Sequence, residues 1–330
     1  VMDRIVEAVE AEGADAWFAS DMSRFLGPDL NPDDFEQITD ILDVWFDSGS
    51  THSFVLEQRD DLQWPASLYL EGSDQHRGWF HSSLLESCGT RGRAPYDAVL
   101  THGFVMAEDG QKMSKSLGNI TAPQEVVEQH GADILRLWVV GSDYSDDLRI
   151  GKEIIKHHSD IYRRLRNTLR FLLGNLNDFD EAEKLPVNEM PELDRWALHR
   201  IHELDAMIRK ACDTYEFHSL FTELHNFCAV DLSAFYLDIR KDALYCDQAS
   251  STQRRAARTV LDQLFNCLTA WFAPFICFTA EEAWLARFPD DNDSVHLRLF
   301  PEIPGIWKND KLAAKWSKIR DLRRVVTGAL

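Results

Sequence analysis

The stretch AVLTHGFVMAEDGQKMSKSLG, residues 98–118, does most to decide the fold of this chain. It begins as a short apolar run rich in β-branched residues, which is typical of a strand, and continues as a polar loop bounded by glycines. A similar run, ASLYL at 66–70, stops at Glu71-Gly72 and precedes a helical pattern at 79–88. Strand, loop and helix in alternation predict an α/β layer whose functional groups lie at the carboxyl ends of the strands.

From about residue 151 the sequence changes to amphipathic helices. Apolar residues recur at helical spacing in four segments, 153–176, 192–215, 219–238 and 253–272, separated by short linkers. This pattern predicts a helical bundle, so we expect an α/β domain over residues 1–150 and an all-α domain over residues 151–330. The apolar window 260–286 is interrupted by polar residues and by Pro274, which indicates a buried, kinked helix pair and not a membrane span.

The bulk composition argues against a disordered, collagen-like or low-complexity protein. With 45% hydrophobic and 27% charged residues, the chain is an ordinary globular sequence, and no signal peptide is evident. A net charge of −20 counts against indiscriminate nucleic-acid binding, although a local basic surface remains possible. The six cysteines are scattered without a CxxC pair, so we expect a reducing cytoplasm and no metal site in these residues.

The polar loop carries the sharpest chemical pattern. Lys112 and Lys115 lie three residues apart, with hydroxyl groups at Ser114 and Ser116. Such a loop can bring ammonium groups and hydroxyl donors onto a polyphosphate, where a positioned lysine stabilises the charge of the leaving pyrophosphate. A solvated polar loop is the ordinary alternative for two lysines, but the full string KMSKS makes it the less favoured interpretation.

Two further strings contain candidate ligand-binding residues. In YLEGSDQHRGWF, residues 69–80, a carboxylate at a strand end can bind an amino-acid ammonium group or ribose hydroxyls, and Gly72 allows close approach to the backbone. Taken singly, His76 is expected at the surface and Trp79 in the core. The string DVWFDSGS, residues 43–50, by itself predicts a hydrophobic strand ending in a turn, with Trp45 in the core.

In this order and spacing, the three strings resemble those of class I aminoacyl-tRNA synthetases, and residues 71–80 resemble the bacterial-type isoleucine enzymes. The resemblance continues at 132–138, 162–168 and 274–282. It implies an internal fragment that contains the C-terminal part of a Rossmann-like catalytic domain and a helical-bundle anticodon-binding domain. The implied reaction is ATP-dependent activation of isoleucine and its transfer to tRNA(Ile), with Mg²⁺ accompanying ATP, in a cytoplasmic monomer.

The resemblance also implies roles for individual residues. Lys115 is implied as the ATP-phosphate ligand, with Lys112 assisting it and Ser114 and Ser116 in the same ATP-binding loop. The isoleucyl-adenylate is implied to contact Glu71 and a group of pocket residues, namely Gly72, Asp74, Gln75, His76, Trp45 and Trp79.

Two elements of the family have no counterpart in residues 1–330. The His-x-Gly-His element that holds the nucleotide does not occur in this sequence, and neither does the family's C-terminal zinc-binding region. We therefore expect these 330 residues not to activate isoleucine by themselves.

A basic helix face is the candidate tRNA contact. Arg163, Arg166 and Arg170 fall at i, i+3 and i+7, and Lys156 lies seven residues before Arg163 on roughly the same side. The family places this helix near the inner corner of the tRNA, where phosphate contacts position RNA without reading its sequence. A solvated face with intrahelical ion pairs is the alternative.

Two other functions stay open at this point. One is a valyl-tRNA synthetase fragment, and the other is a stand-alone tRNA-binding module that has no catalytic role. Aromatic residues could hold anticodon bases, but most of the candidates lie at helical spacing and are expected in the core: Trp196, Tyr215, Phe217, Tyr236 and Trp271.

Overall fold

The computed structural model describes residues 1–290 and 292–329, which form two compact units: residues 1–101, and residues 102 onward. These are units of packing, and each is described by itself. The domain boundary expected between residues 150 and 151 stays a prediction.

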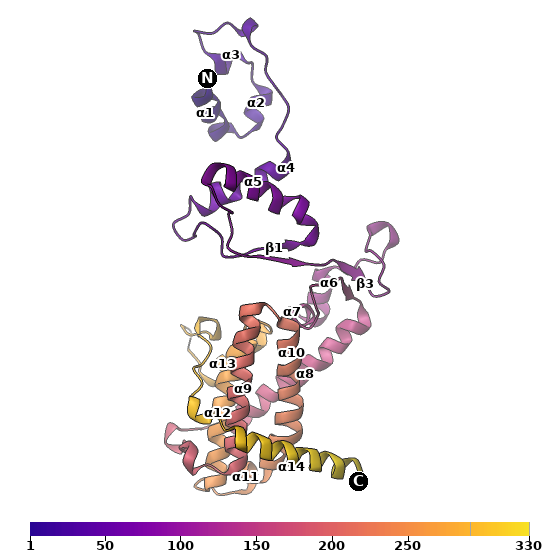
Figure 1. Cartoon of the computed structure of the whole chain (residues 1–330), viewed down its shortest axis with the longest axis vertical. Helices are drawn as coiled ribbons and strands as arrows, with labels where there is room; N and C mark the ends of the chain where they lie inside the picture. Colours follow the sequence, from indigo (N-terminus) through magenta and orange to yellow (C-terminus); the bar gives the residue numbers. More distant parts are fainter. Residues whose placement is uncertain (291, 330) are drawn as a thin grey trace. The chain divides into compact units, whose positions relative to one another are not determined.

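The first unit combines short helices with a two-stranded sheet (Figure 1). A small core near its start contains Ala8, Ala16 and Phe25. Strands β1 and β2 pair with each other, and β2 leads out of the unit. The elements are α1 (Met2–Glu12), α2 (Asp15–Ala19), α3 (Ser23–Leu26), α4 (Val44–Gly49), β1 (Tyr69–Gly72), α5 (Trp79–Arg91) and β2 (Val99–His102).

The prediction of a strand in residues 43–50 is wrong, because residues 44–49 form helix α4. The Asp43 carboxylate caps the helix by accepting a hydrogen bond from the Trp45 backbone N–H at 2.8 Å. Trp45 is also not in the core, since it is 41% exposed. The local cap outweighs the apolar run because Asp and Gly have low strand propensity.

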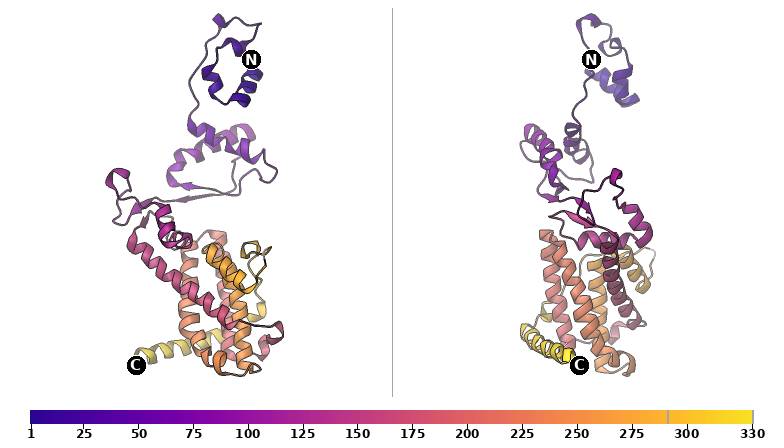
Figure 2. Two further views of the ribbon diagram at one scale, coloured as in Figure 1. Left: turned by 180° about the vertical axis from the view of Figure 1, so that it is seen from behind. Right: turned by 90° about the vertical axis from the view of Figure 1, so that its right-hand side faces the viewer.

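The second unit is a small parallel sheet followed by a helical bundle. Strand β3 pairs with β4 in parallel, with Val105 opposite Leu148 and Ala107 opposite Ile150. Figure 2 shows the bundle helices running alongside one another. The elements are β3 (Val105–Ala107), α6 (Pro123–His130), α7 (Ala132–Val140), β4 (Leu148–Ile150), α8 (Lys152–Asn175), α9 (Glu192–Thr214), α10 (Phe217–Asn226), the π-helical η7 (Phe227–Tyr236), α11 (Leu237–Cys246), α12 (Thr252–Phe272), α13 (Cys277–Arg287) and α14 (Asp310–Ala329).

Most predicted elements of this unit are confirmed within a few residues, with two differences. The segments at 153–176, 192–215 and 253–272 are α8, α9 and α12. The run at 98–105 is two strands instead of one, because the Gly103 N–H bonds to the Tyr144 carbonyl at 2.9 Å and the chain leaves the first sheet. The segment at 219–238 is α10 followed by the π-helical η7, and the helix continues into α11.

Helix α12 lies at the centre of the bundle and supplies much of its core. Val260, Leu264, Phe265 and Leu268 are fully buried, and so is Trp271. Trp196 and Tyr236 are also buried, whereas Tyr215 and Phe217 are half-buried. The expectation that most of these aromatic residues are core is confirmed. The kinked helix pair is confirmed as well, since α12 ends at Phe272 and α13 begins at Cys277 after Pro274. Among the described helices, none has the length and apolar character needed to cross a membrane.

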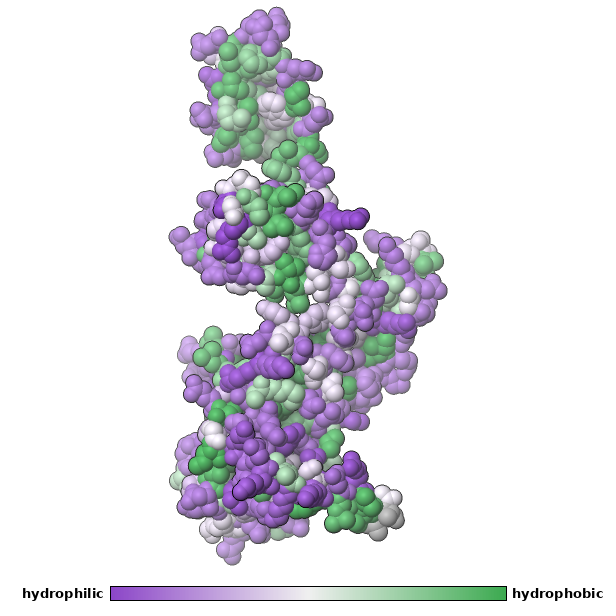
Figure 3. All heavy atoms as spheres, in the orientation of Figure 1, coloured by the Kyte–Doolittle hydropathy of each residue, from purple (hydrophilic) through white to green (hydrophobic). Residues whose placement is uncertain are grey.

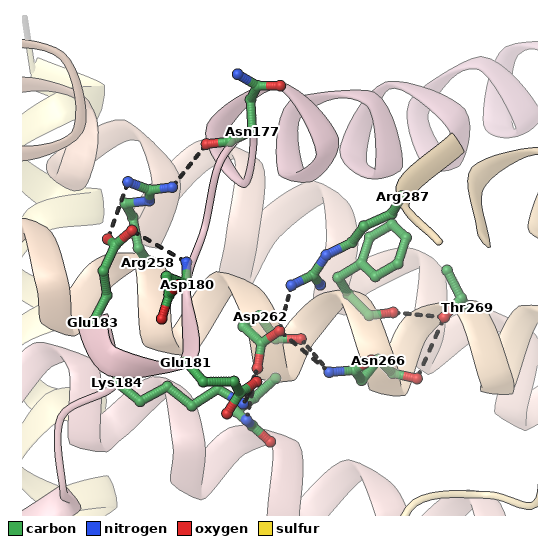
Figure 4. Close-up of polar contacts among 12 residues, drawn as sticks. Asn177, Asp180, Glu181, Glu183, Lys184, Arg258, Asp262, Asn266, Thr269 and Arg287 are labelled. Atoms are coloured by element: carbon green, nitrogen blue, oxygen red, sulfur yellow. Dashed lines mark hydrogen bonds and ion pairs between the residues drawn. The ribbon is translucent and has the colours of Figure 1, made fainter. Parts of the chain in front are cut away.

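A buried ionic network attaches the linker between α8 and α9 to α12 (Figure 4). The Asp262 carboxylate on α12 is 2% exposed and contacts the Arg287 guanidinium at 2.5 Å and the Lys184 ammonium at 3.0 Å. Nearby, Arg258 pairs with Glu183 at 3.0 Å and donates to the Asn177 carbonyl at 2.8 Å. Each buried charge has a counter-ion, which a desolvated charge requires.

Candidate functional site

The first half of the lysine-containing loop is a turn held by backbone hydrogen bonds between residues 106–107 and residues 111–112. The Ala107 N–H donates to the Gln111 carbonyl at 2.9 Å, and Lys112 forms an antiparallel bridge with Met106. Gly110 has φ of 83°, a conformation that favours glycine. Met113 packs against the cluster that contains Trp138 and anchors the middle of the loop.

Asn119 holds the second half of the loop in place. Its side-chain oxygen accepts from the Ser114 N–H at 2.9 Å, and its amide nitrogen donates to the Lys112 carbonyl at 3.3 Å. The Ser114 hydroxyl lies 3.1 Å from that of Ser116 and accepts from the Leu117 N–H at 3.3 Å. Sequence reasoning missed Asn119, although a side chain with both a donor and an acceptor after a glycine was an available signal.

The two lysines of the loop point their charge into solvent. Lys112 and Lys115 are exposed, and no carboxylate pairs with either among the described residues. Met113 and Asn119 thus fix the backbone while the ammonium groups remain available. This arrangement suits a loop that contacts a polyphosphate, because the cations need not first give up a partner.

The string at 69–80 carries its polar residues at the end of β1. Glu71 is exposed and accepts from the Gly72 N–H at 3.0 Å, and Gly72 itself is buried. Asp74 and His76 are exposed in the short 3₁₀ segment that follows. Gln75 spans this segment, because its side-chain oxygen accepts from the Trp79 N–H at 3.0 Å and so caps α5.

Both tryptophans lie where α4 packs on α5. Trp79 stacks on Tyr69 with ring centroids 4.2 Å apart and donates from Nε1 to the Ser48 carbonyl at 2.8 Å. Trp45 lies against Gly78, where an added Cβ would come within 3.2 Å of its ring. The structure therefore places Trp45 against Gly78, and Trp79 against Tyr69 of β1, the strand that contains Glu71.

The basic face of α8 is exposed and largely ion-paired. Arg163 pairs with Asp160 at 2.5 Å, Lys156 with Glu153 at 3.6 Å, and Arg166 with Glu282 of α13 at 3.3 Å. Arg170 has no carboxylate partner among the described residues. Exposed ion pairs contribute little free energy, so these arginines can exchange a carboxylate for a phosphate at small cost.

The predicted site residues thus fall into three groups. The adenylate candidates lie in the first unit, whereas the ATP-loop lysines and the α8 cations lie in the second. The α8 cations extend along one helix, whereas the loop lysines lie three residues apart in one turn. No set of three potential metal ligands comes together among the described residues.

Comparison with known families divides the chain in two. Residues 1–151 match the family described as tRNA synthetases class I (I, L, M and V), and residues 194–329 match the anticodon-binding domain of tRNA ligases. Both matches agree with the resemblance found from the motifs.

Curated relatives match the whole chain. It is 61% identical over 331 aligned residues to the isoleucine–tRNA ligase of Mesorhizobium japonicum and 58% identical to that of Brucella abortus. The isoleucine–tRNA ligase of Pelagibacter ubique is 52% identical over 98% of the chain. The chain spans about a third of the length of these relatives, 33%, 34% and 36% respectively.

Solved structures share the fold at low sequence identity. LeuRS of Agrobacterium radiobacter K84, in a ternary complex with tRNA and LeuAMS, aligns with a TM-score of 0.66 at 17% identity over 83% of this chain and 34% of that one. Methionyl-tRNA synthetase of Mycobacterium tuberculosis, with methionyl-adenylate, aligns with a TM-score of 0.59 at 19% identity over 77% of this chain and 54% of that one. These neighbours confirm the expected fold, an α/β part followed by an all-α part.

Proposed function

This chain belongs to the class I aminoacyl-tRNA synthetases, and from that membership we propose that it acts as part of an isoleucine–tRNA ligase. The observation that carries the proposal is the 61% identity over the whole chain to a protein of that name. The proposed substrates are isoleucine, ATP with Mg²⁺, and tRNA(Ile). A valine-specific activity is not favoured, because the relatives named above are isoleucine ligases.

The contribution of the second unit to activation is charge stabilisation by its loop. Isoleucine carboxylate attacks the α-phosphate of ATP, and negative charge develops on the leaving pyrophosphate. Lys115, assisted by Lys112, would stabilise that charge, while Asn119 and Met113 hold the loop backbone. Ser114 and Ser116 supply hydroxyl donors beside the lysines.

The contribution of the first unit is recognition of the adenylate. Glu71, at the end of β1, offers a carboxylate to the ammonium group, and Trp45 and Trp79 offer apolar surface to the isoleucine side chain. Gly72, Asp74, Gln75 and His76 are proposed to line the same pocket. A monomeric state and a cytoplasmic location remain predictions.

A chimaera tests the catalytic part of the proposal. This chain replaces the matching segment of the Mesorhizobium japonicum ligase, and isoleucine-dependent pyrophosphate exchange is measured. We expect activity, and a loss of about 100-fold or more in the Lys115→Ala chimaera, since removing one preorganised charge-stabilising group has that effect. Lys311→Ala, an exposed lysine of α14, is the matched control. A fully active Lys115→Ala chimaera would refute the assigned role.

The tRNA preference is tested with the 330-residue chain itself. Transcripts of tRNA(Ile) and tRNA(Val) are titrated against it at one salt concentration. We expect tRNA(Ile) to bind at least about tenfold more tightly, which corresponds to about 1.4 kcal/mol. Equal binding of the two would contradict the isoleucine assignment for this part of the protein.

A further inference from the structure

A cavity of about 400 Å³ between α8 and α10 gathers titratable side chains that the proposed reaction does not use. It lies at the end of α7, beside Gly141. Four of its lining residues are histidines, and a guanidinium and a carboxylate complete the ionisable set: His157, His158, Asp160, Arg164, His218 and His225. In a chain of net charge −20, such a concentration of basic groups is a local reversal of sign.

The four imidazoles are not equivalent. His158 is 7% exposed and donates from Nδ1 to the Ile154 carbonyl at 2.9 Å, and burial lowers the pKa of His158. It is therefore a neutral wall of the cavity. His218 donates from Nδ1 to the Gly141 carbonyl at 2.7 Å, which leaves its Nε2 available. The Nε2 of His225 is buried and has no hydrogen-bond partner among the described residues.

The cavity holds more positive than negative groups. Arg164 is exposed and has no ion pair within the described part of the chain. Burial, Arg164 and His157 together lower the pKa of His225. The carboxylate of Asp160 is already paired with Arg163 at 2.5 Å. The next carboxylate, Asp143 in the loop after α7, bonds to Ser145 and is close enough to His218 for an electrostatic interaction.

Arg164 also lines a second cavity, so the basic surface continues along α8. This cavity, of about 460 Å³, lies between α8 and the π-helical η7. Its polar lining includes Asn167, Ser233 and Lys241, and none of its described lining residues is acidic. Donors therefore follow one another along the groove on both sides of Arg164, which suits an extended polyanion better than a single small ion.

We propose that the cavity between α8 and α10 binds a phosphodiester group of tRNA through Arg164 and the protonated imidazoles of His157, His218 and His225. The proposal rests on the proposed function, because that function supplies RNA as the ligand. Guanidinium and imidazolium N–H groups form short, charge-assisted hydrogen bonds to phosphate oxygens. This site lies on a different face of α8 from Arg163, Arg166 and Arg170.

The site makes tRNA affinity depend on pH. A bound phosphate stabilises the charged form of an imidazole beside it, so affinity rises as pH falls. The pKa of His225 is lowered in the free protein, so its contribution appears below the ordinary histidine value of about 6.5. At higher pH the positive charge of the cavity comes from Arg164.

Binding of a tRNA(Ile) transcript to the whole 330-residue chain at about pH 6 and about pH 8 tests the proposal. The unmodified chain should bind several-fold more tightly at the lower pH. The variant His157→Gln/His225→Gln should lose most of that difference, and Arg164→Gln should bind more weakly at both pH values. Replacing Arg166 and Arg170 by Ala is the matched control, which should weaken binding and keep the pH difference, because neither side chain lines the cavity.

Inorganic phosphate, followed through the imidazole proton signals in NMR, tests the cavity without RNA. We expect phosphate to shift the signals of His157 and His225. If phosphate shifts them while the pH dependence of tRNA binding survives in the double variant, the cavity is a free-phosphate site and the RNA assignment is overturned. If tRNA binds with the same pH dependence in the double variant and phosphate does not shift the imidazole signals, the inference fails and the proposed function stands. Absence of tRNA binding would refute both.

Discussion

Asn119 has no proposed role in the reaction, but it positions the backbone of the loop that carries the two candidate lysines. Its side chain bonds to the backbone of both Lys112 and Ser114 and so connects the two arms of the proposed ATP loop. Lys112 and Lys115 remain exposed above this connection. The identity of the lysines follows from the sequence motif, whereas their position depends on a neighbour outside it.

Replacing Asn119 by Ala should loosen the loop. Each lost hydrogen bond contributes about 1 kcal/mol, so amide exchange at residues 112–118 should accelerate by about fivefold or more. Hydrogen–deuterium exchange with mass spectrometry measures this directly. Asn31→Ala removes a cap in the first unit and should leave the loop unchanged. Unaltered exchange in Asn119→Ala would mean that the two bonds do not hold the loop.

His158 should make the stability of the second unit depend on pH. Burial lowers its pKa in the folded protein, so the folded state favours the neutral ring. Its contribution is fully present above the ordinary value of about 6.5 and is lost as pH falls through the lowered pKa. Thermal unfolding in phosphate-free buffer at about pH 5 and about pH 7.5 should show a smaller acid loss in His158→Gln. An equal loss of thermal stability at acidic pH in the unmodified chain and in His158→Gln would show that His158 does not cause the loss.

At the scale of elements, α12 is attached to its neighbours by charges as well as by apolar packing. Asp262 on α12 contacts Arg287 of α13 and Lys184 of the linker that follows α8. The Arg287 and Asp262 side chains are 12% and 3% exposed, so both ions have lost most of their water. Such a pair is costly to break from one side, because the remaining charge stays buried.

Asp262→Ala should therefore destabilise the helical unit by about 3 kcal/mol or more. Denaturant unfolding followed by helical circular dichroism measures the change. Asp238→Ala is the matched control, because its exposed pairs with Lys241 and Arg323 should contribute about 1 kcal/mol or less. Similar effects of the two substitutions would show that burial does not govern this network.

At the scale of the whole chain, charge and apolar surface are unevenly distributed. The net charge is −20, yet α8 carries six basic and two acidic residues between 152 and 170. In Figure 3 the surface is mostly hydrophilic, with an apolar patch at the end of α14, where Leu322, Val325 and Val326 are exposed. A local basic helix on an acidic body can attract RNA while the rest of the surface repels it.

The Arg163→Ala/Arg166→Ala/Arg170→Ala variant should bind tRNA(Ile) more weakly and with a flatter salt dependence. Each phosphate contact contributes close to one unit to the slope of log affinity against log salt, so the slope should fall by about 2–3. A variant with Arg24, Arg59 and Arg93 replaced by Ala changes the net charge equally, using exposed, ion-paired arginines of the first unit. An equal effect of both variants would indicate a general charge effect.

Local patterns were sufficient for much of this molecule. Helices α8, α9 and α12 follow from apolar residues at helical spacing, since a long amphipathic pattern is compatible with one structure. The candidate site residues follow from motif identity, because the chemistry depends on which groups are present. These residues still await the functional tests above.

The sequence by itself therefore determined the fold class and the long helices, and it supplied the candidate site residues, including Lys112 and Lys115, as predictions. Only the tertiary structure decided that residues 44–49 are helical, that Asn119 holds the loop, and that His157 and His225 share a cavity. The reason is physical: the helix cap and the loop bonds depend on single side chains, and the shared cavity depends on contacts between segments that are distant in the chain. The periodicity of apolar residues reports none of these contacts.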